Sequence, residues 1–259
     1  MGERLGQHFL TDKKILERIA DSVSDGPLVE IGPGHGELTE FLLAKNPSRI
    51  LTSIERDPHL AKLFLKRFPK SQYPNTTLIE GDARTELPSL LSRVGHAGAP
   101  AVVGNIPYYL SGFLFRILGE LEHKPSEVIL TIQKEVAERA AATPPHMTLL
   151  SASLQIWCKP SVLFDIPAEA FSPPPKVRSS VLKLVPHIPA PSGKSLEATF
   201  AVIRALFRQP RKKAMSNLLV GYPDKKTEIS EFFRSFLILE TARPQEFSVE
   251  HIILLSRLL

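Results

Sequence analysis

The chain has only one cysteine, Cys158, among its 259 residues, and it lacks any long apolar segment. A single cysteine cannot form a disulfide within the chain or supply a cysteine-based zinc site. The N-terminal residues lack the apolar centre of a signal peptide, and no apolar run approaches the roughly 18 residues that a membrane-spanning helix needs. The 8 histidines are scattered and form no convincing ligand cluster. We therefore expect a reduced, cytoplasmic protein that binds no metal and enters no membrane.

Charge of neither sign dominates the chain. Lysine and arginine number 32 against 27 acidic residues, a net charge of +5, and hydrophobic residues make up 43%, which is typical of a folded protein. The excess is uneven, because residues 189–259 hold 11 lysines and arginines against 7 acidic residues, a net +4 that leaves +1 for the other 188 residues. A mild basic excess permits a polyanionic partner such as RNA, and its position favours the C-terminal part as the basic surface.

The first two-thirds of the chain alternate between short apolar runs and segments with helical periodicity. A helix that Thr11 or Asp12 can cap carries apolar residues on one face, and a helix over 58–67 begins with proline. This alternation predicts an α/β fold, with a parallel sheet covered by helices on both faces. The predicted strands cover residues 28–31, 50–54, 76–79, 101–103 and 128–132, and a hairpin pair of residues 162–166 and 177–185 is expected at the sheet edge.

A change of structural class follows a stretch rich in proline, serine and glycine at residues 186–194. Such a composition predicts a linker. The residues beyond it show helical periodicity and no strand-like run. The sequence therefore predicts two domains, an α/β domain over 1–188 and a small all-helical domain over 189–259. The helices of the second domain are expected at 196–207, 212–220, 227–237 and 248–259.

A glycine-rich turn, residues 30–36 (EIGPGHG), joins the first predicted strand to a helix. Gly32 and Gly34 allow a tight turn and the close approach of a ligand to the backbone. The spacing is not that of the dinucleotide fingerprint, and the chain has no phosphate-binding loop of the nucleotide triphosphatases. Glu55 ends the second strand, where it can accept both ribose hydroxyls, and Asp82 follows the third, where it can accept from an adenine amino group. Each carboxylate alone fits a surface loop, but together with the turn they favour an adenosine-type ligand.

The tetrapeptide Asn105-Ile106-Pro107-Tyr108 lies at the end of the fourth predicted strand. The exocyclic amine of adenine is a poor nucleophile, because its lone pair is delocalised into the ring. The Asn105 side-chain oxygen and the Ile106 carbonyl can hold its two N–H bonds out of the base plane, while Pro107 keeps the residue before it extended. Tyr108 can stack on the base. The tetrapeptide could instead be a structural turn with a buried tyrosine. Its position at the end of the fourth strand, in a fold that also has the glycine turn, favours a role in the methylation of an amine.

Together, these motifs resemble the ribosomal RNA small-subunit adenine N6,N6-dimethyltransferases, the kasugamycin-resistance type. The resemblance implies S-adenosylmethionine as methyl donor, a Rossmann-like methyltransferase sheet and a helical C-terminal domain. As the target it implies two adjacent adenines near the 3′ end of the small-subunit rRNA, within the assembling subunit, and we expect a monomer. The matching segments are residues 6–10 (GQHFL), 30–39 (EIGPGHGELT), 54–57 (IERD), 81–83 (GDA), 104–108 (GNIPY), 133–136 (QKEV) and 171–181 (FSPPPKVRSSV).

The resemblance also implies roles for individual residues. Phe171 matches an aromatic residue that holds the target base opposite Tyr108. Without the resemblance, Phe171 would be interpreted as a hydrophobic plug, His8 as part of a turn before a helix, and Leu10 as a core residue. The positions that match donor contacts in the family are His8, Leu10, Gly32, Glu55, Asp82 and Asn105, and Gly34 is added from the glycine turn.

Basic residues in two segments are candidates for RNA contact. Lys176 and Arg178 follow three consecutive prolines and can hold phosphates. The run over 207–213 resembles a basic run of the family, but Pro210 stands where an arginine is usual, which removes one charge. Residues 140–147 (AAATPPHM) also depart from the family pattern. The RNA contacts predicted in the basic run are Arg208, Arg211, Lys212 and Lys213.

Two other functions share some of these features. The large-subunit adenine methyltransferases of the macrolide-resistance type use the same Asn-Ile-Pro-Tyr logic. Pro33, the Gly-Asp-Ala segment and the triple proline favour the small-subunit type. A non-catalytic RNA-binding or assembly factor is the other alternative, but a protein that only binds RNA has no need for Glu55, Asp82 and Asn105.

Overall fold

The computed structural model describes residues 8–94, 98–187 and 193–259. The chain forms two compact units, one of residues up to Ala137 together with Ser161–Pro186, and the other of Glu138–Pro160 together with the residues from His187 onward. The second crossing lies close to the predicted boundary at 188. The first crossing has no counterpart in the predicted domains, because residues 138–160 pack with the helical unit. Met147, Ala152 and Ile156 lie in its hydrophobic core.

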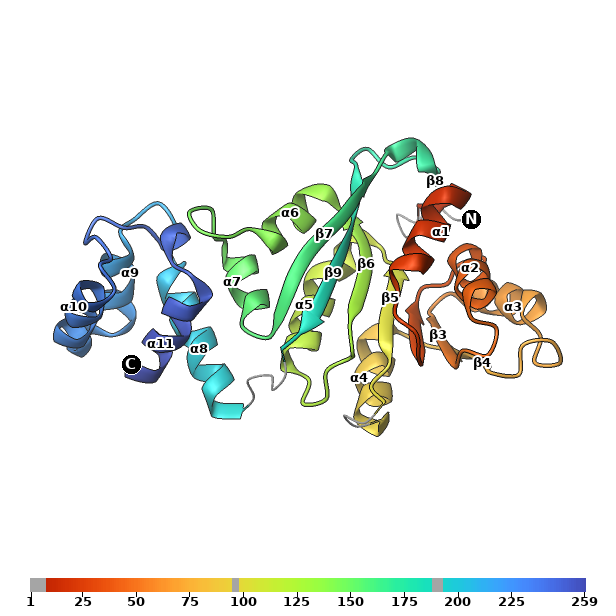
Figure 1. Ribbon diagram of the computed structural model, residues 1–259, viewed down its shortest axis with the longest axis horizontal. Helices are drawn as coiled ribbons and strands as arrows, with labels where there is room; N and C mark the ends of the chain where they lie inside the picture. Colours follow the sequence, from red (N-terminus) through yellow and green to blue (C-terminus); the bar gives the residue numbers. More distant parts are fainter. Residues whose placement is uncertain (1–7, 95–97, 188–192) are drawn as a thin grey trace. The chain divides into compact units, whose positions relative to one another are not determined.

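The first unit contains a seven-stranded sheet (Figure 1). Strands β2 to β6 all run parallel to one another in the sheet. Strand β9 runs antiparallel to β6. The predicted α/β fold class is therefore confirmed. In spatial order the strands are β4 (Thr76–Glu80), β3 (Leu51–Glu55), β2 (Leu28–Ile31), β5 (Ala101–Asn105), β6 (Val128–Gln133), β9 (Ser179–Pro186) and β7 (Cys158–Ile166).

The expected edge pair of strands is β7 and β9, which are neighbours at the end of the sheet. Their connection is longer than a hairpin turn and holds η3 (Ala168–Ala170) and β8 (Phe171–Ser172). Strand β8 pairs with β1 (Phe9–Leu10) in a separate antiparallel ladder. In β9 the first four side chains are all buried, because both faces of this strand are covered, so its sequence does not alternate cleanly.

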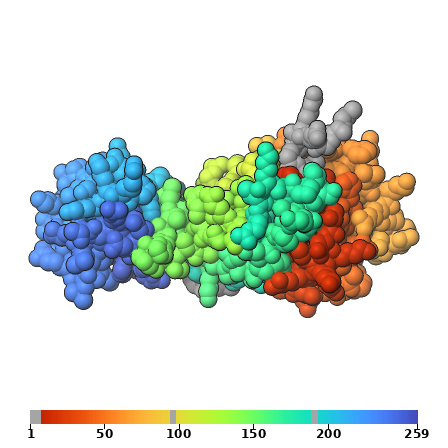
Figure 2. Space-filling view, turned by 90° about the horizontal axis from the view of Figure 1, so that it is seen from above, coloured from red at the N-terminus to blue at the C-terminus, as the bar shows by residue number. Residues whose placement is uncertain are grey.

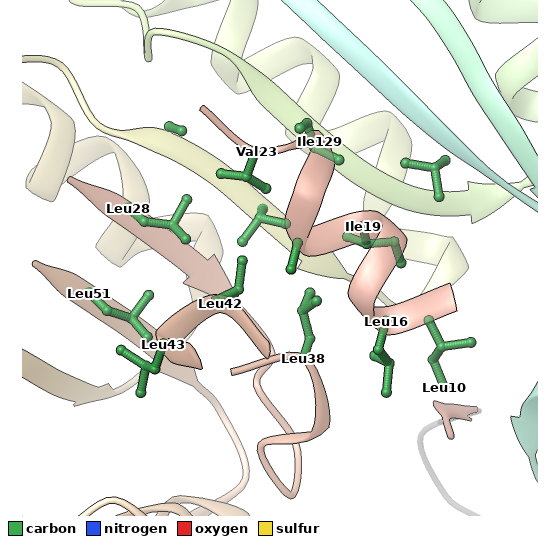
Figure 3. Packing of buried hydrophobic residues seen from close by; sticks show 14 of the residues in the cluster. Leu10, Leu16, Ile19, Val23, Leu28, Leu38, Leu42, Leu43, Leu51 and Ile129 are labelled. Atoms are coloured by element: carbon green, nitrogen blue, oxygen red, sulfur yellow. The ribbon is translucent and has the colours of Figure 1, made fainter. Parts of the chain in front are cut away.

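Helices cover the sheet, and aspartate side chains cap the N-termini of α1 and α3. Asp12, not Thr11, caps α1 by accepting from two backbone N–H groups, and Asp57 caps α3 in the same way with Pro58 at the first helical position. Figure 3 shows Leu38 of α2 beside Leu16 of α1, and both belong to the same buried cluster as Ile19 and Leu42. The helices of this part are α1 (Lys13–Ser22), α2 (Glu37–Lys45), α3 (Pro58–Arg67), α4 (Ala83–Val94), η2 (Tyr108–Leu110), α5 (Ser111–Glu120) and α6 (Lys134–Ala141), which continues into the second unit.

The regular elements of the second unit are helices over its described residues, apart from the first three residues of β7. Its core includes Leu206, Leu218, Phe233 and Phe247, all with 1% exposure or less. Helix α8 begins at Gly193, inside the predicted linker, whose residues 188–192 lie outside the described ranges. The helices are α7 (Leu149–Gln155), α8 (Gly193–Leu206), α9 (Ala214–Gly221), η4 (Pro223–Lys225), α10 (Lys226–Ser235), η5 (Pro244–Glu246) and α11 (Val249–Leu258).

Candidate active site

The first unit has a pocket where β2, β3, β4 and β5 end. All residues predicted to contact the methyl donor or the target base line this pocket. The N-terminal residues, the glycine turn, three strand ends and β8 thus meet at one place, although they are far apart in the sequence. The predicted residues in the lining are His8, Leu10, Gly32, Gly34, Glu55, Asp82, Asn105, Ile106, Pro107, Tyr108 and Phe171.

Two glycines make the close packing of this edge possible. Gly34 has a φ of +60°, and a Cβ on it would lie 3.0 Å from the Phe9 ring. A Cβ on Gly104 would lie 2.6 Å from the Ile31 carbonyl oxygen, nearer than real Cβ atoms approach. The glycine turn therefore lies directly beside the strand that leads into Asn105.

Glu55 lies at the end of β3 with only 5% of its surface exposed. Its carboxylate accepts from the backbone N–H of Gly34 at 3.2 Å and from that of Asp57 at 2.9 Å. Burial raises the pKa of Glu55, and these backbone donors oppose the rise. The two bonds fix the carboxylate while it keeps lone pairs for further donors.

Asp82 lies at the pocket rim after β4 and is held by Arg84. The Arg84 guanidinium donates to one carboxylate oxygen at 2.9 and 2.7 Å, and the Arg84 backbone N–H donates to the other at 2.9 Å. The bond from Arg84 lowers the pKa of Asp82, which stays an ionised acceptor. Arg84 was not among the predicted site residues, and its only signal in the sequence is its place two residues after Asp82.

The Asn105 amide is oriented by the N-terminal segment. Its Nδ2 donates to the His8 carbonyl oxygen at 3.0 Å, so the amide oxygen remains the atom that accepts from an amino group. His8 Nδ1 lies 2.8 Å from the Pro173 carbonyl oxygen, and Leu10 pairs with Phe171 in the β1–β8 ladder. Figure 2 shows green-blue residues of the part of the chain that includes β8 next to the red part near the N-terminus.

Two aromatic residues line the pocket near Asn105. Phe171 is 3% exposed and belongs to the hydrophobic core as well as to the pocket wall. Its position is thus compatible both with a hydrophobic plug and with an aromatic residue that contacts the target base. Tyr108 is half-buried, and its hydroxyl lies 2.7 Å from Ser179 Oγ. Burial raises the Tyr108 pKa, so the phenol is neutral at physiological pH. Ser179 was not predicted to belong to the site.

Glu30 lies beneath the glycine turn and is almost completely buried. One oxygen of its carboxyl group accepts from Thr39 Oγ1 at 2.7 Å and from Ser53 Oγ at 3.2 Å. Burial raises the Glu30 pKa to about 7, and the two hydroxyl donors oppose the rise. Sequence patterns did not identify this network, because its members come from three separate elements.

The predicted RNA contacts are exposed basic residues in each unit. Lys176 and Arg178 lie between β8 and β9 in the first unit. The basic run of the second unit lies between α8 and α9, where Asn217 Nδ2 donates to the carbonyl oxygens of Leu206 and Gln209 at 2.8 and 2.9 Å and holds the loop. The exposed residues of this run are Arg208, Arg211, Lys212 and Lys213.

The part of the chain that the structure describes contains neither a membrane-spanning helix nor a group of side chains that could hold a metal ion. In residues 8–94, 98–187 and 193–259, no helix is long and apolar enough to cross a bilayer. Within the same part of the chain, no three histidine, cysteine or acidic side chains are grouped to hold a metal ion.

Comparison with known proteins identifies relatives along almost the entire chain. Residues 2–256 match the family described as ribosomal RNA adenine dimethylase. The ribosomal RNA small subunit methyltransferase A of Chromohalobacter salexigens is 35% identical over 97% of this chain and 88% of its own length. The protein of the same name from Coxiella burnetii is 33% identical over 100% of this chain and 98% of its own length.

Solved structures share the fold. A dimethyladenosine transferase from Plasmodium falciparum has a TM-score of 0.78 and 23% identity, with 96% of both chains covered. The 23S rRNA methyltransferase ErmE has a TM-score of 0.75 and 24% identity, covering 97% of this chain and 99% of its own. These likenesses support the predicted methyltransferase sheet with a helical C-terminal part.

The Glu30→Gln variant is expected to flatten the pH dependence of stability. Because burial raises the Glu30 pKa from 4.5 to about 7, its contribution to stability is complete below about pH 4.5 and is lost as the pH rises through about 7. The free energy of unfolding of the wild type should therefore fall between pH 5.5 and 8 by about 2 kcal/mol more than that of the variant. Urea unfolding at both pH values measures this difference.

Glu127→Gln is the matched control for Glu30→Gln. Burial of Glu127 opposes ionisation, but bonds from Lys183 and from Ser24 prevail and lower its pKa. Its contribution is therefore present at neutral pH and lost on acidification, so Glu127→Gln should destabilise the protein most above pH 5. Equal pH dependence in Glu30→Gln and the wild type would contradict the raised pKa of the buried Glu30.

Proposed function

Because the chain belongs to the ribosomal RNA adenine dimethylase family, we propose that its pocket dimethylates two adjacent adenines near the 3′ end of small-subunit rRNA. The protein is an S-adenosylmethionine-dependent enzyme that dimethylates adenine in the rRNA of the small subunit. The observation that carries the site assignment is the meeting of Glu55, Asp82 and Asn105 in one pocket.

The pocket fits S-adenosylmethionine, which supplies an activated methyl group on a sulfonium sulfur. Glu55 offers acceptors for the ribose hydroxyls, and Asp82 offers acceptors for the adenine amino group. Asp82 is bonded to Arg84, but a carboxylate has about four lone-pair sites, so acceptor capacity remains. His8 and Leu10 close the pocket on the N-terminal side.

The target amine needs acceptors more than it needs a base. The Asn105 amide oxygen and the Ile106 carbonyl hold its N–H bonds out of the base plane, which localises the nitrogen lone pair. Tyr108 and Phe171 hold the base between them, one on each face of its ring. The amine becomes strongly acidic only as it is methylated, so no side chain has to remove a proton beforehand.

The small-subunit target is favoured over the large-subunit alternative. The relatives named for small-subunit methylation are 33–35% identical over nearly the whole chain. The likeness to the 23S rRNA methyltransferase ErmE, at 24% identity, concerns the fold alone. The donor-site carboxylates also support an enzyme over a protein that only binds RNA.

The cellular setting of the reaction completes the proposal. The enzyme acts in the cytoplasm, as a monomer, on the assembling small subunit. Support for a monomer comes from the pocket, because one chain supplies the acceptors for the donor and the wall for the base. Sedimentation of the protein, alone and with small subunits, distinguishes a monomer from a dimer.

Wild-type protein, incubated with labelled S-adenosylmethionine and undermethylated small subunits, is expected to form dimethyladenine at two neighbouring positions. Mass spectrometry of the rRNA maps these positions. Large subunits serve as the control substrate and should remain unlabelled. Labelled large subunits, or no dimethyladenine beside an active control enzyme, would refute the assignment.

Asn105→Ala is expected to lower kcat by about 10²-fold, because one acceptor for the amine is lost. Most of the affinity for S-adenosylmethionine should remain, as measured by calorimetry. Asn75→Ala is the control, since Asn75 donates to the Ser48 carbonyl in an exposed loop outside the pocket. Unchanged turnover in Asn105→Ala would exclude the proposed role.

The double variant Arg211→Ala, Lys212→Ala is expected to bind small subunits more weakly and with less dependence on salt. Each lost phosphate contact reduces the slope of log affinity against log salt by about 0.7 to 0.9. Lys225→Ala is the control, because Lys225 is paired with Glu228 at 3.0 Å in the same unit. If the slope of log affinity against log salt were the same in the double variant and in Lys225→Ala, the basic run would not contact RNA.

A further inference from the structure

We propose that Ser179 is a positioning residue for methyl transfer, an inference that rests on the proposed function of the pocket. The Ser179 hydroxyl lies 2.7 Å from the Tyr108 hydroxyl, and Ser179 is completely buried. Tyr108 lines the pocket beside Asn105. A side chain that fixes the Tyr108 ring thereby fixes the wall against which the target base stacks.

The location of Ser179 explains why its hydroxyl reaches the pocket. It is the first residue of β9 and pairs with Gln133, the last residue of β6. The following residue, Ser180, pairs with Ile132, and its hydroxyl donates to Asp165 at 2.7 Å. Because successive side chains of a strand point to opposite faces, the two serines serve different partners.

The bond gives the Tyr108 ring a second attachment. The backbone of Tyr108 lies in the short helix η2, which is joined to the sheet through β5, and the ring would otherwise be free to turn about its side-chain torsions. The hydroxyl at the far end of the ring is held by a strand of the same sheet. Two attachments, one through Cβ and one through the hydroxyl, fix the direction of the ring axis before a base arrives, which lowers the entropy cost of binding it.

Further observations agree with this role. Burial raises the Tyr108 pKa, so the phenol keeps its proton and the bond to Ser179 is available at physiological pH. The His8 ring lies 6.1 Å from the Tyr108 ring, with 30° between their planes, so the N-terminal segment limits ring motion as well. Ser179 itself needs no contact with RNA or with the methyl donor.

Ser179→Ala is expected to lower kcat on undermethylated small subunits by about tenfold, the effect of releasing one immobilised side chain. Affinity for S-adenosylmethionine should not change, because Glu55 and Asp82 are untouched. Ser180→Ala is the matched control. It removes the same atom from an equally buried neighbour, and kcat should stay within about twofold of the wild type.

A double-mutant cycle distinguishes positioning from a general structural effect. Tyr108→Phe keeps the stacking ring and removes the bond from the other end. Ser179→Ala should therefore have no further effect on kcat in the Tyr108→Phe background. The same loss of kcat in both backgrounds, or no loss in the single variant, would overturn the proposal.

Two measurements keep the test decisive. If Ser179→Ala does not fold, Ser179→Cys keeps the volume and a weak donor, and it should show a smaller loss of kcat than Tyr108→Phe, while an equal or larger loss would count against the proposal. Wild-type protein is assayed in parallel. Inactive wild type would contradict the proposed function, whereas active wild type with unchanged Ser179→Ala would contradict only the role of Ser179.

Discussion

The parallel pairing of β2 with β3 and β5 is the constraint on which the pocket depends. In-register pairing places Ile31 beside Ile54, and Glu55 beside Glu80 of β4, so all these strands end at one edge. The backbone therefore leaves the sheet at four neighbouring points. At each of them the end of the strand, or the loop that follows it, contributes residues to the pocket. Gly104 allows the closest of these approaches, since its lack of a side chain lets β5 lie against the Ile31 carbonyl.

A short ladder links the donor side of this edge to the base side. Strands β1 and β8 contribute only two residue pairs, yet they connect parts of the chain that are about 160 residues apart. Through this ladder Leu10 lies beside Phe171, and His8, which directly precedes β1, presents its carbonyl to Asn105. The position of residues 8–10 therefore affects both the orientation of the Asn105 amide and the position of Phe171. In the proposed function, residues 8–10 therefore connect the binding of the methyl donor with the shape of the base site.

Sequence patterns predicted those parts whose cause is local. The strand at 28–31 and the helix at 58–67 have the predicted ends, because an apolar run and an Asp-Pro cap are local signals. Glu55 and Asp82 were predicted to lie at the same edge of the sheet, because carboxylates after successive parallel strands have a known geometric consequence, and both line the pocket. Ser179 and the Thr39–Glu30 network were missed, since each depends on side chains from elements far apart in the sequence. Residues 138–160 were missed for the same reason, because only tertiary packing assigns them to the helical unit.

The distribution of charge within the pocket gives a reason why the proposed acceptors for the amine are neutral groups. Glu30 and Glu55 are already buried at the edge of the sheet, and burial raises the pKa of both. A further carboxylate in place of Asn105 would add repulsion in the same low-dielectric region and would favour its own protonation. A protonated acid would donate toward the amine instead of accepting from it. The Asn105 amide and the Ile106 carbonyl accept at every physiological pH, so the geometry of the target amine is separated from the titration of the groups beneath it.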